Sequence, residues 1–275
     1  MKKKFIPLAI LSMLMNGCAT VQYQSAPPLT TNLVTHEIAK SNLLTHTNHT
    51  LMHLNQNGDI LYQQNFGGGG AGVGILLGPI GVMANIAAIE SNTEDDVKIL
   101  KDKLDFNPSE IFIKSTGKYQ IEVANGNADS IKLSPYIYVS KTENEQLLFA
   151  SALIVETEPG KQSNWLGKYM YQIPLKMAKS DISDGINEKE YSLLKSELEK
   201  GFDELARLYS EDRKGNLKTE QALTFISDFV SPRFNIEMVG DLIPSDANRV
   251  NIRTVGGVYS LPKDSVKVKF KKSKT

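Results

Sequence analysis

The fold is decided by residues 131–175, IKLSPYIYVSKTENEQLLFASALIVETEPGKQSNWLGKYMYQIPL. Three runs in this stretch are rich in β-branched and aromatic residues, at positions 131–139, 147–155 and 169–175. Runs of this length and composition are typical of β-strands, and turn residues such as Pro159-Gly160 separate them. The stretch therefore predicts that strands form the centre of the protein.

Two shorter apolar runs precede this stretch, at residues 111–113 and 121–123, and a turn signal, Asn125-Gly126-Asn127, follows them. We include both runs among the strands. Residues 106–180 are thus predicted to form an antiparallel β region, either one sheet or a small sandwich.

A helical pair is predicted next, over residues 181–232. Asn187 with Glu190 three residues later is typical of a helix start. Apolar residues then recur every three or four positions, as on one face of a helix: Tyr191, Leu194, Leu198, Phe202, Leu205 and Leu208. A second helix is expected over residues 219–230, ending before Pro232, because the residue before a proline disfavours the α conformation.

The flanking segments complete an α+β fold. Residues 233–275 are expected to be a C-terminal β-hairpin region, with Gly256-Gly257 as a two-residue turn. Residues 51–105 contain a hairpin around Asn57-Gly58, a glycine-rich apolar segment and a short helix near residues 94–104. The predicted fold class is an antiparallel β-sheet with a helical pair and a C-terminal β-hairpin region.

The N-terminus has the order of a secretory signal. Lys2, Lys3 and Lys4 precede an uncharged run at residues 5–15, which is too short to span a bilayer. The run ends in Leu14-Met15-Asn16-Gly17-Cys18, which resembles the lipobox of bacterial lipoproteins, although that family usually has Leu where Met15 stands and a small residue where Asn16 stands. The resemblance implies that residues 1–17 are a signal peptide, removed before Cys18.

The same resemblance implies a lipid anchor on Cys18. Since Ala19 rather than Asp follows, it also implies the periplasmic side of the outer membrane as the location. Cys18 is the only cysteine, so an internal disulfide is impossible. The alternative to a lipoprotein is a plain secreted protein in which Cys18 is a stray thiol. Residues 18–50, rich in Ser, Thr and Asn, are expected to be a lipid-anchored spacer.

Composition excludes some partners. The 31 basic and 31 acidic residues balance, and removing the signal leaves 28 basic ones, so the mature protein is slightly acidic. This gives no electrostatic reason to expect nucleic acid. The expected partners are the membrane, through the lipid on Cys18, and an envelope protein or a second copy of the chain.

The segment from residue 66 to residue 89 has no charge in 24 residues and contains eight glycines. Gly70, Gly74 and Gly78 recur every four residues, a spacing that on a helix allows another backbone to approach closely and that resembles the glycine zipper of some outer-membrane lipoproteins. One prediction is that these three glycines pack against another backbone or contact a membrane. The alternative, which we favour, is a buried glycine-rich loop followed by a core helix near residues 82–89.

Metal and cofactor sites are not expected. The four histidines, His36, His46, His49 and His53, lie within eighteen residues, but no carboxylate or cysteine joins them locally. A dinucleotide-type glycine pattern occurs without the βαβ unit that it needs. A calcium-binding loop between the two predicted helices is not expected, since Lys214 stands where an oxygen ligand is required.

Catalysis by a nucleophile and a histidine base is disfavoured, because no His or Cys follows His53. Carboxylate pairs such as Glu211 and Asp212 are interpreted as solvated charge. The function expected from the sequence is a lipid-anchored, non-enzymatic binding or scaffolding protein of the envelope. The alternative is a carboxylate-based hydrolase of the cell wall, which needs two carboxylates about 5–10 Å apart in a cleft.

Overall fold

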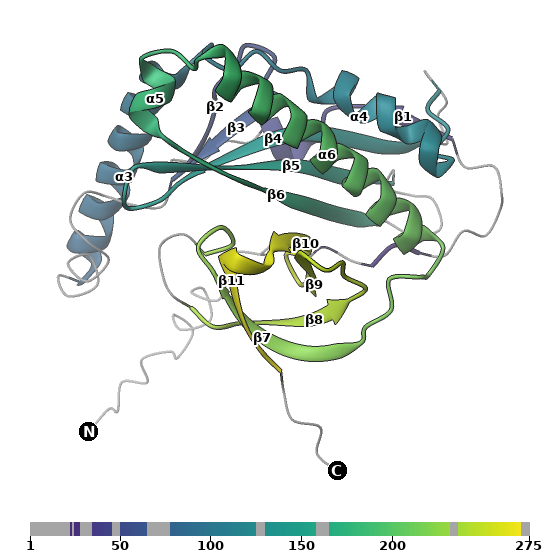
Figure 1. The fold of residues 1–275 in the computed structure, drawn as a ribbon. Helices are drawn as coiled ribbons and strands as arrows, with labels where there is room; N and C mark the ends of the chain where they lie inside the picture. Colours follow the sequence, from purple (N-terminus) through teal and green to yellow (C-terminus); the bar gives the residue numbers. More distant parts are fainter. Residues whose placement is uncertain are drawn as a thin grey trace, which may run out of the picture.

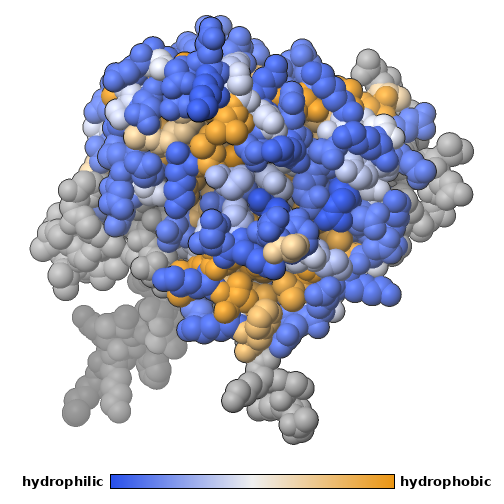
Figure 2. Space-filling model, in the orientation of Figure 1, coloured by the Kyte–Doolittle hydropathy of each residue, from blue (hydrophilic) through white to orange (hydrophobic). Residues whose placement is uncertain are grey.

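The fold was obtained as a computed structural model that describes residues 23, 25–27, 35–45, 50–64, 78–124, 130–157, 165–231 and 236–270. It has an α+β fold, as predicted, in which helices cover one face of the central strands and the C-terminal strands lie on the other side (Figure 1). Figure 2 shows polar residues over most of one side of the molecule, with an apolar area over the C-terminal strands.

The centre is an antiparallel meander, confirming the prediction from residues 131–175. Its strands are β4 (Ile131–Lys141), β5 (Gln146–Glu156) and β6 (Leu166–Ala178). Along β5, Phe149 and Leu153 pack on the helical side, whereas Ala150 and Ile154 pack on the side of the C-terminal strands. Residues 147–155 of this strand are apolar except Ser151, because successive side chains point to opposite faces and both faces are buried.

The sheet is mixed, so the prediction of a purely antiparallel sheet is wrong. From one edge, its C-terminal half runs in the order β11 (Val266–Phe270), β7 (Gln221–Ser227), β8 (Met238–Ile243), β9 (Arg249–Thr254) and β10 (Gly257–Pro262). It continues with β6, β5, β4, β3 (Ile60–Gln63) and β2 (Leu51–His53), and β1 (His36–Ile38) also pairs with β4. The pairs β1 with β4, β3 with β4 and β10 with β6 are parallel. Parallel neighbours require crossover connections, and such long-range pairing leaves no local pattern in the sequence.

The N-terminal strands extend the sheet beyond β4. They are β1 (His36–Ile38), β2 (Leu51–His53) and β3 (Ile60–Gln63), and a short helix, α1 (Asn42–Thr45), follows β1. The predicted hairpin is present between β2 and β3, with Gly58 at φ +69° in its turn. Because β1 is part of the sheet, the folded body begins well before residue 51, and the structure differs from the predicted spacer over residues 18–50.

The helical layer contains one long helix that the sequence identified. Its helices are α3 (Gly78–Leu100), α4 (Pro108–Thr116), α5 (Lys179–Ser183) and α6 (Glu188–Arg213), with a 3-10 turn, η2 (Gly117–Tyr119). The Asn187 side chain accepts a hydrogen bond from the Glu190 N–H at 2.9 Å and caps α6. Gly201 lets α6 approach β5, since a Cβ there would lie 2.5 Å from Ser151 Oγ.

Two predicted elements have the other secondary structure. Residues 111–113 lie in α4, because Asn107 caps its N-terminus and Pro108 suits its first turn. The expected second helix, 219–230, contains a strand, β7 (Gln221–Ser227). Leu223 and Phe225 are buried while the residue between them is only half-buried, a period of two that identifies a strand. The predicted helical pair is therefore wrong.

The C-terminal β region is confirmed. Its remaining strands are β8 (Met238–Ile243), β9 (Arg249–Thr254), β10 (Gly257–Pro262) and β11 (Val266–Phe270), with a 3-10 turn, η3 (Lys263–Ser265), before β11. The turn between β9 and β10 is Val255-Gly256, one residue earlier than predicted, because Gly257 already pairs with Thr254. These strands fold over β5 and β6, and the two halves of the sheet enclose a second apolar core.

Candidate functional site

The structure places few of the predicted site residues. Cys18, Gly70 and Gly74 lie outside the described residues, and Gly78 is the first residue of α3. Among the described residues nearest to Cys18 in sequence, Tyr23, Ala26 and Pro27 contact the body. We therefore take as the candidate site the N-terminal attachment, which we define as the contacts of Tyr23, residues 25–27 and His36 with the body.

Three backbone groups hold the first part of this attachment. The Tyr23 N–H donates to the Val255 carbonyl oxygen at 3.1 Å. The Ala26 N–H donates to an Asp212 carboxylate oxygen at 3.3 Å, and the Pro27 carbonyl accepts from the Arg213 guanidinium at 2.8 Å. The N-terminal segment thus joins both the end of α6 and the turn between β9 and β10.

Asp212 is the centre of the attachment. Its side chain is only 5% exposed, and it accepts hydrogen bonds from the Tyr169 hydroxyl at 2.7 Å and from the Arg253 guanidinium at 2.6 Å. A buried carboxylate is stable only when it is paired in this way. Asp212 therefore ties α6 to β6 and β9, and the interpretation of Glu211 and Asp212 as solvated charge is wrong for Asp212.

Aromatic side chains surround this ion pair. Tyr209 lies next to it on α6, with its ring stacked on Trp165 at 6.1 Å between centroids. The Arg213 guanidinium lies over the same Trp165, 5.6 Å from the ring centroid. These contacts exclude water from the end of α6 and strengthen its charged hydrogen bonds.

His36 fixes β1 to the same place. Its Nδ1 lies 3.0 Å from the Glu122 carbonyl oxygen, which can only accept, so Nδ1 carries the hydrogen. Its Nε2 then accepts from the Tyr209 hydroxyl at 2.7 Å. Burial lowers the pKa of His36, and the nearby Arg213 lowers it further, although the bond to Glu122 opposes the shift. The folded protein therefore favours neutral His36.

This arrangement predicts a loss of stability on mild acidification. The pKa of His36 is lowered by folding, so below about pH 6.5 the unfolded chain binds a proton that the folded protein does not. Stability should fall between pH 7.5 and pH 5.5, by at most about 1.4 kcal/mol per pH unit for this group. Urea unfolding at both pH values should show a smaller fall for His36→Gln.

His53, whose pKa burial also lowers, provides the comparison for this measurement. His53→Gln should remove only the part of the acid-induced loss of stability that is due to His53 and leave the part that is due to His36. If His36→Gln lost as much stability on acidification as the parent protein, protonation of His36 would not be the cause.

A second buried ion cluster holds α3 to the body. Asp96, 5% exposed, accepts from the Tyr62 hydroxyl and pairs with Lys141 and with Lys179, the latter at 3.0 Å. Burial would raise the pKa of Asp96, but these three hydrogen bonds outweigh it and the pKa is lowered. Glu145 pairs with both lysines, so the cluster has two charges of each sign.

The first half of α3 differs from this anchored half. No residue from Gly78 to Ile89 is charged, and Met83 is 71% exposed and Ile86 36% exposed. The alternative of a core helix near residues 82–89 therefore does not fit Met83 and Ile86, and among residues 83–89, whose burial is described, only Ile89 is buried. Within the described ranges, no helix combines the length and the apolar character needed to cross a bilayer.

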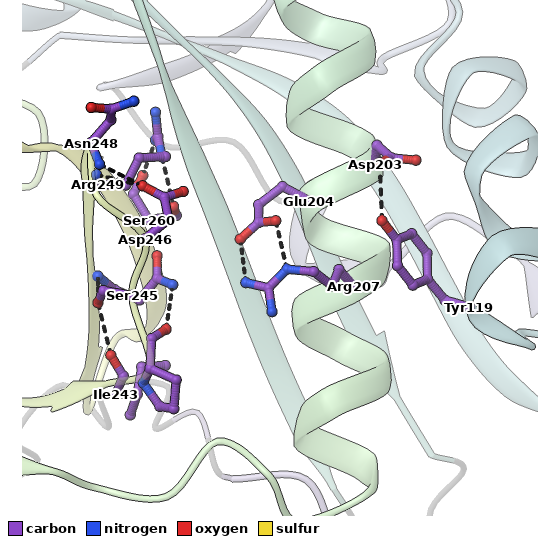
Figure 3. Close-up of polar contacts among 12 residues, drawn as sticks. Tyr119, Asp203, Glu204, Arg207, Ile243, Ser245, Asp246, Asn248, Arg249 and Ser260 are labelled. Atoms are coloured by element: carbon purple, nitrogen blue, oxygen red, sulfur yellow. Dashed lines mark hydrogen bonds and ion pairs between the residues drawn. The ribbon is translucent and has the colours of Figure 1, made fainter.

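A groove between α4 and α6 is the place where paired carboxylates could act. It has a volume of about 380 Å³, and its charged lining is Lys114, Lys118, Glu199, Lys200 and Asp203. Asp203 already accepts from Lys118 at 2.7 Å. It also accepts from the Tyr119 hydroxyl at 3.0 Å (Figure 3). Burial would raise the pKa of Asp203, but these bonds lower it, whereas a general acid needs a raised pKa.

The neighbouring charges are paired as well. Glu204 holds Arg207 through two hydrogen bonds of 2.6 and 2.7 Å on α6, where both residues are half-buried (Figure 3). Across the sheet, Arg249 donates to Ser260 and to the Gln172 carbonyl, and its guanidinium lies 3.6 Å from the centroid of the Tyr171 ring. Arg249 therefore joins β9, β10 and β6 and acts as a structural residue.

The structure describes two of the four histidines, His36 and His53. His36 and His53 lie in separate strands, and His46 and His49 fall outside the described residues. Among the residues that the structure describes, no three His, Cys, Asp or Glu side chains are grouped as metal ligands.

Sequence reasoning missed Asp212, although a signal was present. Asp212 follows Leu205 by seven residues and Leu198 by fourteen, so it continues the apolar face of α6. A carboxylate at such a position is expected to be buried and paired. Its partner Arg253 could not be identified, because it lies 41 residues away on a strand. No family model, curated protein or solved structure was found to match this chain.

Proposed function

We propose that this protein is a lipid-anchored component of the bacterial envelope that binds or scaffolds other components without catalysis, at the periplasmic face of the outer membrane. The observation that carries the proposal is the N-terminal order of three lysines, an uncharged run and Cys18, the only cysteine of the chain. Two or three acyl chains contribute about 0.8 kcal/mol per buried methylene, so such an anchor is effectively permanent.

The N-terminal attachment supports this proposal. A chain held only by its lipid would not need these residues fixed, yet Tyr23 is bonded to the turn between β9 and β10, and Ala26 and Pro27 are bonded to the end of α6. The lowered pKa of Asp203 and its bonds to Lys118 and Tyr119 make the cell-wall hydrolase the weaker alternative. Contact of Gly70, Gly74 and Gly78 with a membrane or another backbone stays a prediction.

Replacing Cys18 with serine should abolish membrane attachment, because the thiol is the acceptor for the lipid. The measurement is metabolic labelling with a fatty acid, together with fractionation of the envelope. The parent protein should carry label and remain with the membrane after a salt wash, whereas Cys18→Ser should be unlabelled and either uncleaved or detached. Normal labelling of Cys18→Ser would refute the lipid anchor.

A further inference from the structure

Exposed apolar side chains gather at one end of the C-terminal sheet. Val255, in the turn after β9, is 76% exposed, Val239 in β8 is 62% exposed, and Ile236 just before β8 is 50% exposed. The register pairs Asp241 with Arg253, and Val239 and Val255 each lie two residues beyond that pair, at the same end of the two strands. We call Ile236, Val239 and Val255 the apolar end.

The start of the chain is fixed to this same place. The Tyr23 N–H is bonded to the Val255 carbonyl oxygen, and Tyr23 is only five positions after Cys18. Five fully extended residues span at most about 18 Å. An acylated Cys18 lies in the membrane surface, so Val255 cannot be farther from that surface than this reach allows.

We infer that the apolar end rests on the lipid bilayer, with its side chains in the headgroup region beneath Val255. This inference depends on the proposed acylation of Cys18. Tyr23 lies beside the apolar end, and its aromatic ring suits the membrane interface. The Lys168 ammonium lies 5.4 Å from the centroid of that ring, and burial lowers the pKa of Lys168 to about 8.

A second copy of the chain fits the apolar end less well. Stable protein interfaces bury about 1,200–2,000 Å² in total, far more than three side chains supply. A bilayer does not need that area, because the anchor already holds the body at a high effective concentration beside the lipid. A weak apolar contact is then sufficient to orient the body.

The test uses the full lipidated protein in phosphatidylcholine vesicles. The acylated Cys18 does not react with a maleimide, so Val255→Cys carries one fluorophore, and Leu193→Cys on α6 gives a matched control. Leu193 is 46% exposed and lies on the helical side, away from the C-terminal strands. A nitroxide attached to the lipid headgroup should quench the label at Val255 several-fold more than the label at Leu193.

Each outcome separates the two proposals. If the protein floats with the vesicles but both labels are quenched equally, the anchor stands and the inference is wrong. If unlabelled Val255→Cys instead forms a disulfide-linked dimer on oxidation and the label at Val255 is not quenched, the apolar end is a self-association surface and the inference is wrong. If mass spectrometry finds no acyl group and the protein does not float, the proposed anchor fails, and the inference fails with it.

Discussion

Asp212→Ala is expected to lower the free energy of unfolding by about 3–5 kcal/mol, as is usual when one partner of a buried ion pair is removed. The side chain of Arg253 is 15% exposed, and without Asp212 its charge would lack a carboxylate partner at the end of α6. The Tyr169 hydroxyl would lose its acceptor in the same place. Urea unfolding followed by circular dichroism measures the change.

Glu211→Ala is the matched control for this measurement. Glu211 is the preceding residue on α6, but it is more exposed and pairs with Lys214 at 3.2 Å on the surface. Such pairs contribute about 1 kcal/mol or less. Similar losses in Asp212→Ala and Glu211→Ala would show that the buried pair does not hold the N-terminal attachment together.

Asp96→Ala is also expected to lower the free energy of unfolding by about 3–5 kcal/mol, but its local effect should be largest in α3. Lys141, 7% exposed, would keep only Glu145 at 3.3 Å, whose own side chain is 54% exposed. Since Asp96 fastens α3, amide hydrogen exchange should accelerate in α3 more than in α6.

Asp95→Ala controls for the loss of an acidic residue from α3. The Asp95 side chain is 63% exposed and pairs only with the exposed Lys98. It should leave both the unfolding free energy and the exchange of α3 nearly unchanged. Uniform acceleration of exchange in α3 and α6 after Asp96→Ala would mean that the cluster stabilises the whole body and does not fasten α3 in particular.

The elements that were predicted correctly have strong local patterns. The helix after Asn187 has a cap and a long apolar stripe, and residues 147–155 are apolar except Ser151, as expected for a strand with both faces covered. The prediction of a helix at residues 219–230 was wrong because the apolar residues of this segment fit both a helix and a strand. Its pairing with β8 and β11 makes it a strand. Short segments of this kind depend on tertiary context.

The candidate site shows the same limit. The motif that ends in Cys18 is contiguous and could be found in the sequence. The environment of Asp212 is assembled from Ala26, Tyr169 and Arg253, which are far apart in the chain, so no local pattern could reveal it. The parallel pairing of β10 with β6, which brings Arg253 to α6, is equally non-local.

The bond between Tyr23 and Val255 joins the first described residue to the turn between two of the last strands. In a chain exported from its N-terminus, as we propose for this one, the contact would close only after nearly all of the chain has been exported. Pairings so distant in sequence form slowly. The docking of Tyr23 would then be one of the last steps of folding.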